Sequence, residues 1–206
     1  MPRPLIPHRR ERILDAAEHL VLSQGFVAMN VAAVAERVGI AKGAIYLEFA
    51  SKRDIREALL RRGADRMSAT VAAQLTEEHP ALSHAYRVTV RALLAEPLMV
   101  AAFLDDEGVL GAHAEGVTDD RFRRHHTMIV DWIADLQSRG RFDPTVSPEH
   151  LGLTLSSATV GLLSAARRFG PISAAQLEGA LSTLADLISF LEIPAADGTL
   201  DNGSTA

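Results

Sequence analysis

The chain has 206 residues, 48% of them apolar, which suits one compact domain or two small ones with a substantial core. It contains no cysteine, so disulfides, thiolate metal sites and cysteine nucleophiles are excluded. No apolar run approaches the length of about 18 residues that a membrane span needs, and the basic N-terminus lacks the apolar core of a signal peptide. We therefore expect a cytoplasmic protein that makes no membrane contact.

The net charge of −5 is unevenly distributed along the chain. Residues 1–66 contain 12 Lys and Arg against 8 Asp and Glu, whereas residues 67–206 contain 9 against 18. A basic end on an acidic chain indicates a protein that meets a polyanion at that end. A solvated surface with a chance imbalance would give the same counts, so charge alone leaves both interpretations open.

Apolar residues spaced three and four apart predict helices throughout, and the alternation typical of strands is absent over any useful length. The first three helices are expected at residues 9–23, 31–37 and 41–49, with Gly25 and Gly39 as the breaks between them. Ser51 and Asp54 form a weak capping box for a fourth helix that runs to about residue 75.

Prolines, serines and glycines mark the later elements. One expected helix begins at Pro80, and Pro97 either ends it or begins the next one. Later helices are expected from Thr118 or Asp119 to Arg139, from Ser147 to Gly170, and from Ser173 to about Leu191. Residues 105–118 contain three glycines and several acids, which predicts a loop. Residues 195–206 are small and polar, which predicts a disordered tail.

Residues 31–49 have the spacing of a helix-turn-helix, which needs a short helix, a tight turn and a second helix. Gly39 suits the left-handed backbone of the turn, and Ile45 and Phe49, four apart, anchor the second helix inward. The outward or DNA-facing positions are then Lys42, Gly43, Ala44, Tyr46 and Leu47. Spacing alone does not separate this reading from plain helix packing.

The order of residues is more specific. The stretches RERILDAAEHLVLSQGF and VAAVAERVGIAKGAIYLEFASKRDI resemble the DNA-binding domain of the tetracycline-repressor (TetR) family over roughly residues 9–60. The matching positions include Gly25-Phe26, Ala35, Gly39-Ile40, Gly43, Tyr46, Phe49 and Lys52. The resemblance implies an all-α fold, in which an N-terminal three-helix helix-turn-helix domain is followed by a helical-bundle ligand-binding and dimerisation domain.

The resemblance also implies roles for single residues. Lys42, Gly43 and Tyr46 would lie on the recognition helix, and Tyr46 and Lys52 would contact phosphates. The alternative for Tyr46 is an aromatic side chain that packs beside Phe49, and the alternative for Lys52 is a solvated residue at a helix end. Asn30 is expected to cap the second helix and to offer a phosphate contact, and Leu47 to touch a thymine methyl.

This chain departs from the family pattern at four positions. Ala41 stands where serine is frequent, Ala44 and Met29 where threonine is frequent, and Glu48 where histidine or tyrosine is frequent. Several hydroxyls that hold phosphate in the family are therefore missing.

The expected division is a DNA-binding domain at residues 1–50, a ligand-binding and dimerisation domain at 51–194, and the tail. Small residues in the next-to-last helix and a heptad-like stripe in the last predict a two-fold four-helix contact between two copies. The predicted dimer residues are Ser157, Gly161, Leu177, Leu181, Leu184 and Ile188. The stripes would equally serve the core of one chain.

An apolar wall with a few polar groups is the usual effector site. The residues predicted to line it are Met99, Phe103, Phe122, His126, Ile129 and Trp132, although each taken singly fits a plain core position. No cofactor or metal is expected, because the eight histidines include no H-x-x-x-H pair, and His125 and His126 point about 100° apart on a helix.

Enzyme motifs of the G-x-S-x-G, H-E-x-x-H and nucleotide-binding types are missing, so an enzyme is not expected. The expected function is a DNA-binding transcriptional regulator, and the resemblance implies repression, the commoner mode of the family. It would bind a palindromic double-stranded DNA operator as a homodimer and be released by a partly hydrophobic small molecule. The alternative is a helical protein-interaction module without ligand sensing.

Overall fold

The computed structural model describes residues 7–104, 107–110, 118–168 and 172–194. Within these ranges every regular element is a helix, and the extended backbone pairs once, in an isolated antiparallel bridge between Phe142 and Glu192. The predicted all-α class is confirmed. None of the helices in these ranges is long and apolar enough to cross a membrane.

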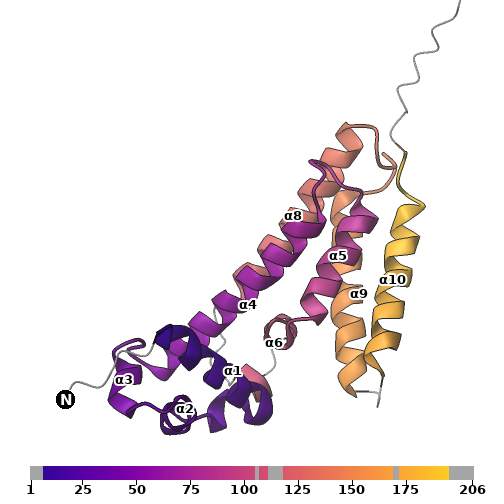
Figure 1. The fold of residues 1–206 in the computed structure, drawn as a ribbon. Helices are drawn as coiled ribbons and strands as arrows, with labels where there is room; N and C mark the ends of the chain where they lie inside the picture. Colours follow the sequence, from indigo (N-terminus) through magenta and orange to yellow (C-terminus); the bar gives the residue numbers. More distant parts are fainter. Residues whose placement is uncertain (1–6, 105–106, 111–117, 169–171, 195–206) are drawn as a thin grey trace, which may run out of the picture.

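Three helices, α1 (Arg9–Ala28), α2 (Val31–Val38) and α3 (Lys42–Tyr46), form the N-terminal end of the molecule (Figure 1). The regular turns of α1 are interrupted at Gly25, as predicted, since its φ of 81° and ψ of 158° are not helical. Gly39 has a φ of 75° and makes the tight turn between α2 and α3, where glycine avoids the strain of other residues. α3 is shorter than predicted, because it ends at Tyr46 rather than near Phe49.

Helix α4 (Lys52–Gln74) connects these helices to the rest of the molecule (Figure 1). The predicted capping box is present: Ser51 Oγ accepts a bond from Asp54 N at 3.2 Å, and Asp54 Oδ2 accepts one from Ser51 N at 3.0 Å. Both otherwise unpaired backbone donors at the start of α4 are thereby satisfied. The rigid start of α4 is therefore fixed directly after the helix-turn-helix.

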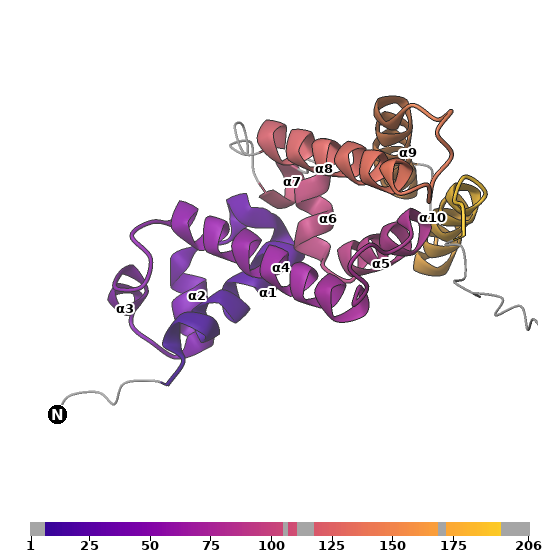
Figure 2. The ribbon, with the colours of Figure 1, turned by 90° about the horizontal axis from the view of Figure 1, so that it is seen from above.

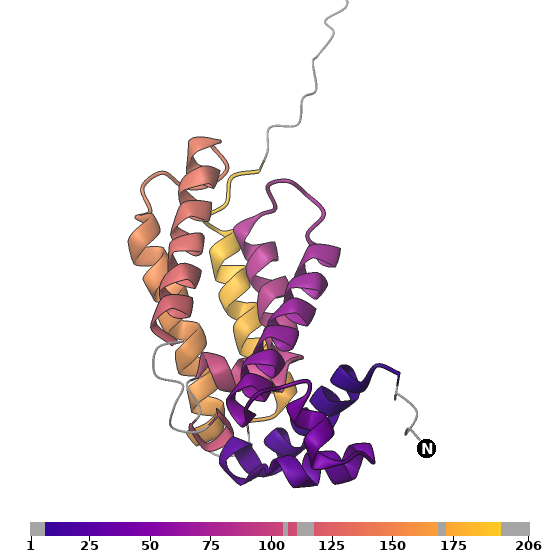
Figure 3. The ribbon, with the colours of Figure 1, turned by 90° about the vertical axis from the view of Figure 1, so that its left-hand side faces the viewer.

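The helical body consists of α5 (Leu82–Leu94), α6 (Pro97–Phe103), α7 (Glu107–Leu110), α8 (Thr118–Ser138), α9 (Pro148–Arg168) and α10 (Ala174–Ser189). α8 packs on α9, α10 packs on α5 and α9, and α4 packs on α5 and α6 (Figures 2 and 3). Pro97 occupies the first turn of α6, so it begins that helix.

Three segments of the body either differ from the sequence prediction or lie outside the described residues. α5 begins at Leu82, two residues after Pro80. The segment predicted as a loop at 105–118 contains α7, because Val109 and Leu110 pack against the N-terminal helices and hold a helical turn in place. The predicted tail at 195–206 lies outside the described residues.

The buried apolar side chains form three clusters. The largest joins α1, α2 and α3 to the first half of α4 through Ile55 and Leu59, and it includes Leu98 of α6. A second, around Ile133, Phe142 and Ile188, closes the far end of the body. A third, around Leu93, Met99 and Leu163, lies where α4, α5, α6 and α9 meet. The N-terminal cluster thus takes in side chains from both sides of residue 50.

We predict opposite stability changes for two glycines of the helix-turn-helix. Gly39→Ala should lower the free energy of unfolding by about 1–2 kcal/mol, because its left-handed backbone disfavours a Cβ. Gly43→Ala should raise it by up to about 1 kcal/mol, because Gly43 is helical and nothing lies within 4 Å of the added Cβ. Urea denaturation of the two variants and the parent measures both changes, and unchanged or raised stability of Gly39→Ala would contradict the turn geometry.

Candidate DNA-binding site and helical body

The outer face of α3 is exposed to solvent. Ile45 and Phe49 are buried and fix the helix against its neighbours, as the four-residue spacing predicts. Lys42 and Gly43 are exposed, and the side chains of Tyr46 and Leu47 are 48% and 78% exposed. The predicted Ala44 is half-buried. α3 lies at the end of the molecule away from α9 and α10 (Figure 1).

Arginines at the start of α1 hold the end of α3. Arg9 Nε donates to Glu48 Oε1 at 2.8 Å, and Arg10 Nη1 donates to the Glu48 carbonyl oxygen at 2.9 Å. The Arg10 guanidinium also lies 4.2 Å from the centre of the Phe49 ring, within cation–π range. A five-residue helix has little stability of its own, so these contacts stabilise its position.

The sequence analysis missed this role of Arg9 and Arg10, because it counted them only as positive charge near DNA. Glu48, noted there as a departure from the family, is the acid that pairs with Arg9. The combination of a basic pair before the first helix and an acid after the third was the available signal. The distance of 39 residues between them hid it.

Asn30 and Lys52 have defined contacts inside the chain. Asn30 Oδ1 accepts a hydrogen bond from Ala33 N at 2.7 Å, which confirms the predicted cap of α2. Lys52 Nζ donates to the Val27 carbonyl oxygen at 3.0 Å and lies 4.6 Å from the centre of the Phe26 ring. Burial lowers the pKa of the Lys52 ammonium. Lys52 therefore braces the end of α1 and is not simply a solvated helix end.

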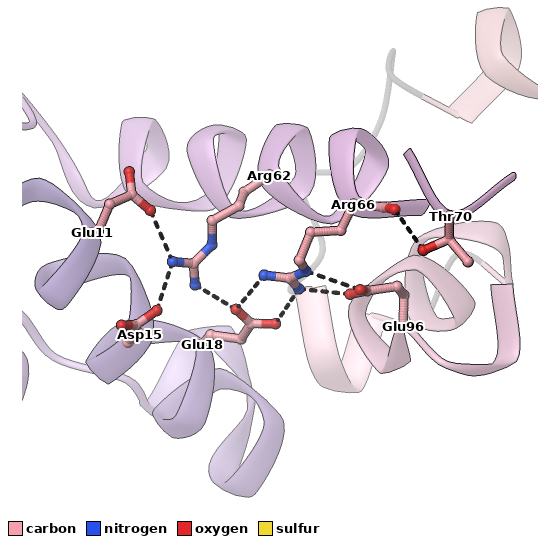
Figure 4. A network of polar contacts seen from close by, with 7 residues as sticks. All are labelled: Glu11, Asp15, Glu18, Arg62, Arg66, Thr70 and Glu96. Atoms are coloured by element: carbon pink, nitrogen blue, oxygen red, sulfur yellow. Dashed lines mark hydrogen bonds and ion pairs between the residues drawn. The ribbon is translucent and has the colours of Figure 1, made fainter. Parts of the chain in front are cut away.

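A network of ion pairs, which we call the charge junction, links α1, α4 and α6 (Figure 4). Arg62 Nη2 donates to Glu18 Oε2 at 2.5 Å, and Arg66 Nη2 donates to Glu18 Oε1 at 2.8 Å. Arg66 also forms a bidentate ion pair with Glu96, through hydrogen bonds of 2.9 Å and 2.6 Å. Glu11 and Asp15 complete the junction through Arg62, at 3.3 Å and 2.7 Å.

Burial and arginine contacts shift the pKa of the Glu18 carboxyl in opposite directions. Burial raises the pKa of the Glu18 carboxyl, but hydrogen bonds and charge attraction from Arg66 and Arg62 outweigh it, so this pKa lies below its ordinary value of 4.5. Glu96 is the N-cap of α6, so Arg66 ties the first residue of that helix to α4. The junction thus joins the DNA-binding end to the body.

Helices α6 and α7 also insert apolar residues beside the helix-turn-helix. Leu98 is buried within the N-terminal cluster, and Val109 packs against it. Arg56 of α4 is buried and donates to the Leu110 carbonyl oxygen at 3.2 Å. On α4, Gly63 permits close approach, since a Cβ there would lie 3.1 Å from Met99 Sδ. Movement of α6 would therefore be felt by both α4 and α1.

The structure distributes the predicted effector residues over separate places. Met99 and Phe103 belong to the cluster beside α4, whereas Ile129 and Trp132 pack in the cluster at the far end. Trp132 Nε1 donates to the Pro80 carbonyl oxygen at 3.3 Å. His126 faces Gly152 of α9, and the side chain of Phe122 lies outside the described residues. The described members of this set do not share one cluster.

The predicted dimer residues of α9 are exposed, whereas those of α10 are buried or partly buried. Ser157 and Gly161 are exposed on α9. Leu181 and Ile188 are buried, and Leu177 and Leu184 are partly buried, because the α10 stripe packs inside the same chain. The structure corrects this part of the prediction: the stripe attaches α10 to its own body. The sequence analysis missed the exposed face of α10, where Leu187 and Phe190 are 58% and 83% exposed.

A surface hollow of about 490 Å³ lies on the N-terminal side, away from the predicted effector residues. Its lining comes from α1, the end of α3 and α4, and it is mostly charged, with Arg10, Glu48, Arg61 and Arg62 among its residues. Two of these residues belong to the contacts that hold α3, and Arg62 belongs to the charge junction. We assign the hollow to that structural network.

Comparison with known proteins agrees with this geometry. Residues 13–59 match the model of the bacterial regulatory proteins of the tetR family. The sequence has no significant match among curated proteins.

Solved structures of bacterial regulators share the fold along almost the whole chain. The fatty acid degradation regulator FadR from Bacillus halodurans has a TM-score of 0.66 at 15% identity, covering 90% of this chain and 96% of its own. A TetR-family transcriptional regulator from Agrobacterium tumefaciens has a TM-score of 0.66 at 19% identity, covering 87% and 97%. The ketosteroid transcriptional regulator KstR2 of Mycobacterium tuberculosis has a TM-score of 0.63 at 20% identity, covering 92% and 98%.

The fold and the helix-turn-helix define the class of the protein as a DNA-binding transcriptional regulator. Residues 13–59 match the tetR family of bacterial regulatory proteins, and the helical body shares the fold of the solved regulators above.

We predict that the charge junction stabilises the fold in a pH-dependent way. Glu18→Gln should lower the free energy of unfolding at pH 7 by about 1–2 kcal/mol, because Arg62 and Arg66 lose a charged partner. A carboxyl with a lowered folded-state pKa stabilises the fold above its ordinary value of 4.5, and this contribution is lost as the pH falls through the folded pKa. The difference between parent and variant should therefore shrink below about pH 4.5.

Glu11→Gln is the matched control for this experiment. Glu11 contacts the same Arg62, but its side chain is largely exposed, so the substitution should change stability by less than about 0.5 kcal/mol. Denaturant unfolding of both variants between pH 3 and pH 7 is the measurement. Equal effects of the two substitutions would show that the junction has no special role for Glu18.

Proposed function

We propose that the protein is a small-molecule-responsive repressor that binds a two-fold symmetric DNA operator as a homodimer. Residues 1–50 would supply the DNA-binding domain and residues 51–194 the ligand-binding and dimerisation domain. The observation that carries the proposal is the exposed outer face of α3, held by arginines of α1 and connected to the body through α4. A helix presented in this way fits the major groove.

On the DNA side, we assign distinct roles to the exposed positions. Lys42 and the Tyr46 hydroxyl would contact phosphates, and Gly43 would let the α3 backbone approach the DNA closely. Leu47 and Ala44 present methyl groups for thymine. Asn30 uses its Oδ1 in the cap, which leaves its amide hydrogens for a phosphate. Lys42 and Asn30 are thus the replacements we propose for the hydroxyls missing at positions 41 and 44.

Lys52 remains part of the proposed DNA interface, but it also has a structural role inside the chain. Its ammonium already bonds the Val27 carbonyl oxygen, so it would approach a phosphate while bracing α1. The strongest test of a phosphate contact is therefore Lys42, whose side chain is exposed.

We predict that DNA binding falls steeply with salt, since lysines and arginines that neutralise phosphates release counterions. Lys42→Ala should weaken binding to all duplexes and reduce the slope of log affinity against log salt by about 0.9. The control is Arg139→Ala, which removes a charge at the far end of α8, where Arg139 pairs with Asp135. Fluorescence anisotropy with duplex DNA from beside the gene measures both slopes. A slope that responds equally to the two substitutions would contradict a role for α3.

The proposed dimer contact uses the outer faces of α9 and α10. Leu153, Ser157 and Gly161 lie at four-residue intervals on the exposed side of α9. Leu187 and Phe190 lie on the exposed side of α10. Large apolar side chains beside small ones suit a close helix contact between two copies. Two copies are needed to place two recognition helices on the half-sites of a palindrome.

We predict that Gly161→Arg prevents dimerisation without unfolding the chain. Nothing lies within 4 Å of a Cβ at Gly161, so one chain accommodates the arginine, whereas a close contact between copies would bury its charge. Light scattering should show a monomer, and operator affinity should be lost. Ala72→Arg, on an exposed position of α4, is the control. A Gly161→Arg dimer with unchanged DNA affinity would mean that the interface lies elsewhere.

The proposed effector is a partly hydrophobic small molecule. The related folds include regulators named for ketosteroids and for fatty acid degradation, and the core around Met99 and Phe103 is apolar. Because α6 contacts both α4 and the N-terminal cluster, an effector that shifts α6 would favour one spacing of the recognition helices over another.

A thermal-shift screen of hydrophobic molecules, with and without operator DNA, tests the response. A molecule that weakens DNA binding tenfold must itself bind about tenfold more weakly to the DNA complex, since the coupling is reciprocal. Failure of every bound molecule to change DNA affinity would contradict ligand sensing while leaving DNA binding intact.

A further inference from the structure

The inner face of α9 carries polar groups inside the body. Gly152, Leu155, Ser156, Thr159 and Leu163 recur at intervals of three and four residues, so they share one face of the helix. A Cβ on Gly152 would lie 3.0 Å from the Val130 side chain and 3.4 Å from His126, so this face meets α8. Thr159 meets Tyr86 of α5. The face is therefore enclosed by α8 and α5.

Two polar atoms at the contact between α9 and α8 have no hydrogen-bond partner among the described residues. Ser156 is 2% exposed, and its Oγ is unpartnered; His126 Nδ1 is likewise buried and unpartnered. A buried polar atom without a partner loses its bonds to water and gains nothing in return. Such groups are rare in folded proteins, so two along one helix contact call for a physical explanation.

The two atoms lie about one helical turn apart along the direction of α9. A Cβ on Gly152 would lie 3.6 Å from His126 Nδ1, and Ser156 follows Gly152 by one helical turn of about 5.4 Å. Nearby, the hydroxyls of Tyr86 and Thr159 lie 2.6 Å apart. The Thr159 hydroxyl donates to the Leu155 carbonyl oxygen at 2.8 Å, so Tyr86 donates to Thr159 and retains an acceptor lone pair. We call these four residues the polar seam.

The buried side chains that the structure describes around the polar seam are apolar. Leu155 and Leu163 are buried on the same face, and Ile129 packs nearby on α8. Arg56 is the one charged residue in the described part of the chain that is fully buried, and it lies on α4 against Leu110. A charged ligand would therefore find no buried counter-charge at the seam, which disfavours its burial. His126 is only half-buried, so the seam reaches the surface along α8.

We propose that Ser156 and His126 bind the polar end of a neutral, mostly apolar effector that carries a hydroxyl or carbonyl group. Tyr86 and Thr159 border this end, and the leucines of α9 contact the apolar part. The proposal rests on the ligand-responsive function above and specifies the chemistry that its site recognises. Of the effector residues expected from the sequence, it retains His126 and adds two residues of α9 and one of α5.

The first test needs no ligand. Because its Oγ has no partner in the described fold, Ser156→Ala should unfold at the same temperature as the parent or a higher one. Ser68→Ala, which removes an exposed hydroxyl from α4, is the control. A melting temperature several degrees below that of the control would mean that the Ser156 hydroxyl is bonded within the fold, and would overturn the proposal.

The second test compares probes that differ only at the polar end. The pairs are 1-naphthol with naphthalene, and cyclohexyl methyl ketone with ethylcyclohexane, titrated into the full-length protein. Ser156→Ala should weaken binding of the alcohol or the ketone by about two- to tenfold, the range of one net hydrogen bond, and leave its hydrocarbon unchanged. His126→Phe should act in the same direction. Equal effects on both members of each pair, or binding by neither pair, would overturn the proposal.

Operator affinity measured in the same samples separates this proposal from the proposed function. A probe that needs Ser156 to bind but leaves DNA affinity unchanged would support the polar seam and contradict ligand-responsive regulation. A molecule that changes DNA affinity equally in the parent, Ser156→Ala and His126→Phe would support regulation and overturn the polar seam.

Discussion

The attachment of α4 to its two neighbours by Arg62 and Arg66 is the interaction on which the arrangement depends. Both arginines share Glu18 of α1, and Arg66 also holds Glu96 at the start of α6. Isolated surface ion pairs contribute little, but here several partly buried charges share partners with short, forked hydrogen bonds. The junction fixes the direction of α4 relative to both ends of the molecule, so the DNA-binding helices and the body take one relative position.

Apolar packing and polar contacts together position the helices around this junction. The N-terminal cluster reaches across to Leu98 of α6, so the helix-turn-helix does not have an isolated core. The arginines of α1 hold the end of α3 through Glu48 and through the ring of Phe49, which is itself part of that cluster. As a result, the exposed residues of α3 contribute little to its anchoring, and their identities are left to the requirements of DNA.

The sequence predicted those features whose causes are local. Gly25 and Gly39 mark breaks because of their own backbone, and Ser51 and Ser173 mark helix starts because their partners lie three residues away. For Leu181 and Ile188 it left two interpretations open, because an apolar stripe fits a partner chain and a neighbouring helix equally well, and the structure buries both residues within the same chain. It also missed the bond between Arg9 and Glu48 and the turn α7, since both depend on tertiary contacts between residues far apart in the chain. The effector residues are the least predictable, because their role depends on which groups the fold leaves unpartnered.

The continuity of α4 has a mechanical consequence. Its 23 residues, at a rise of 1.5 Å each, make a rod about 34 Å long. A tilt of about 5° at the body end of such a rod displaces its other end by about 3 Å. In the proposed dimer, the two recognition helices would have to match successive major grooves about 34 Å apart, and a displacement of this size on each copy would change their separation. In a lever of this kind, a movement of less than one bond length beside Gly63 and Met99 is amplified before it reaches the DNA.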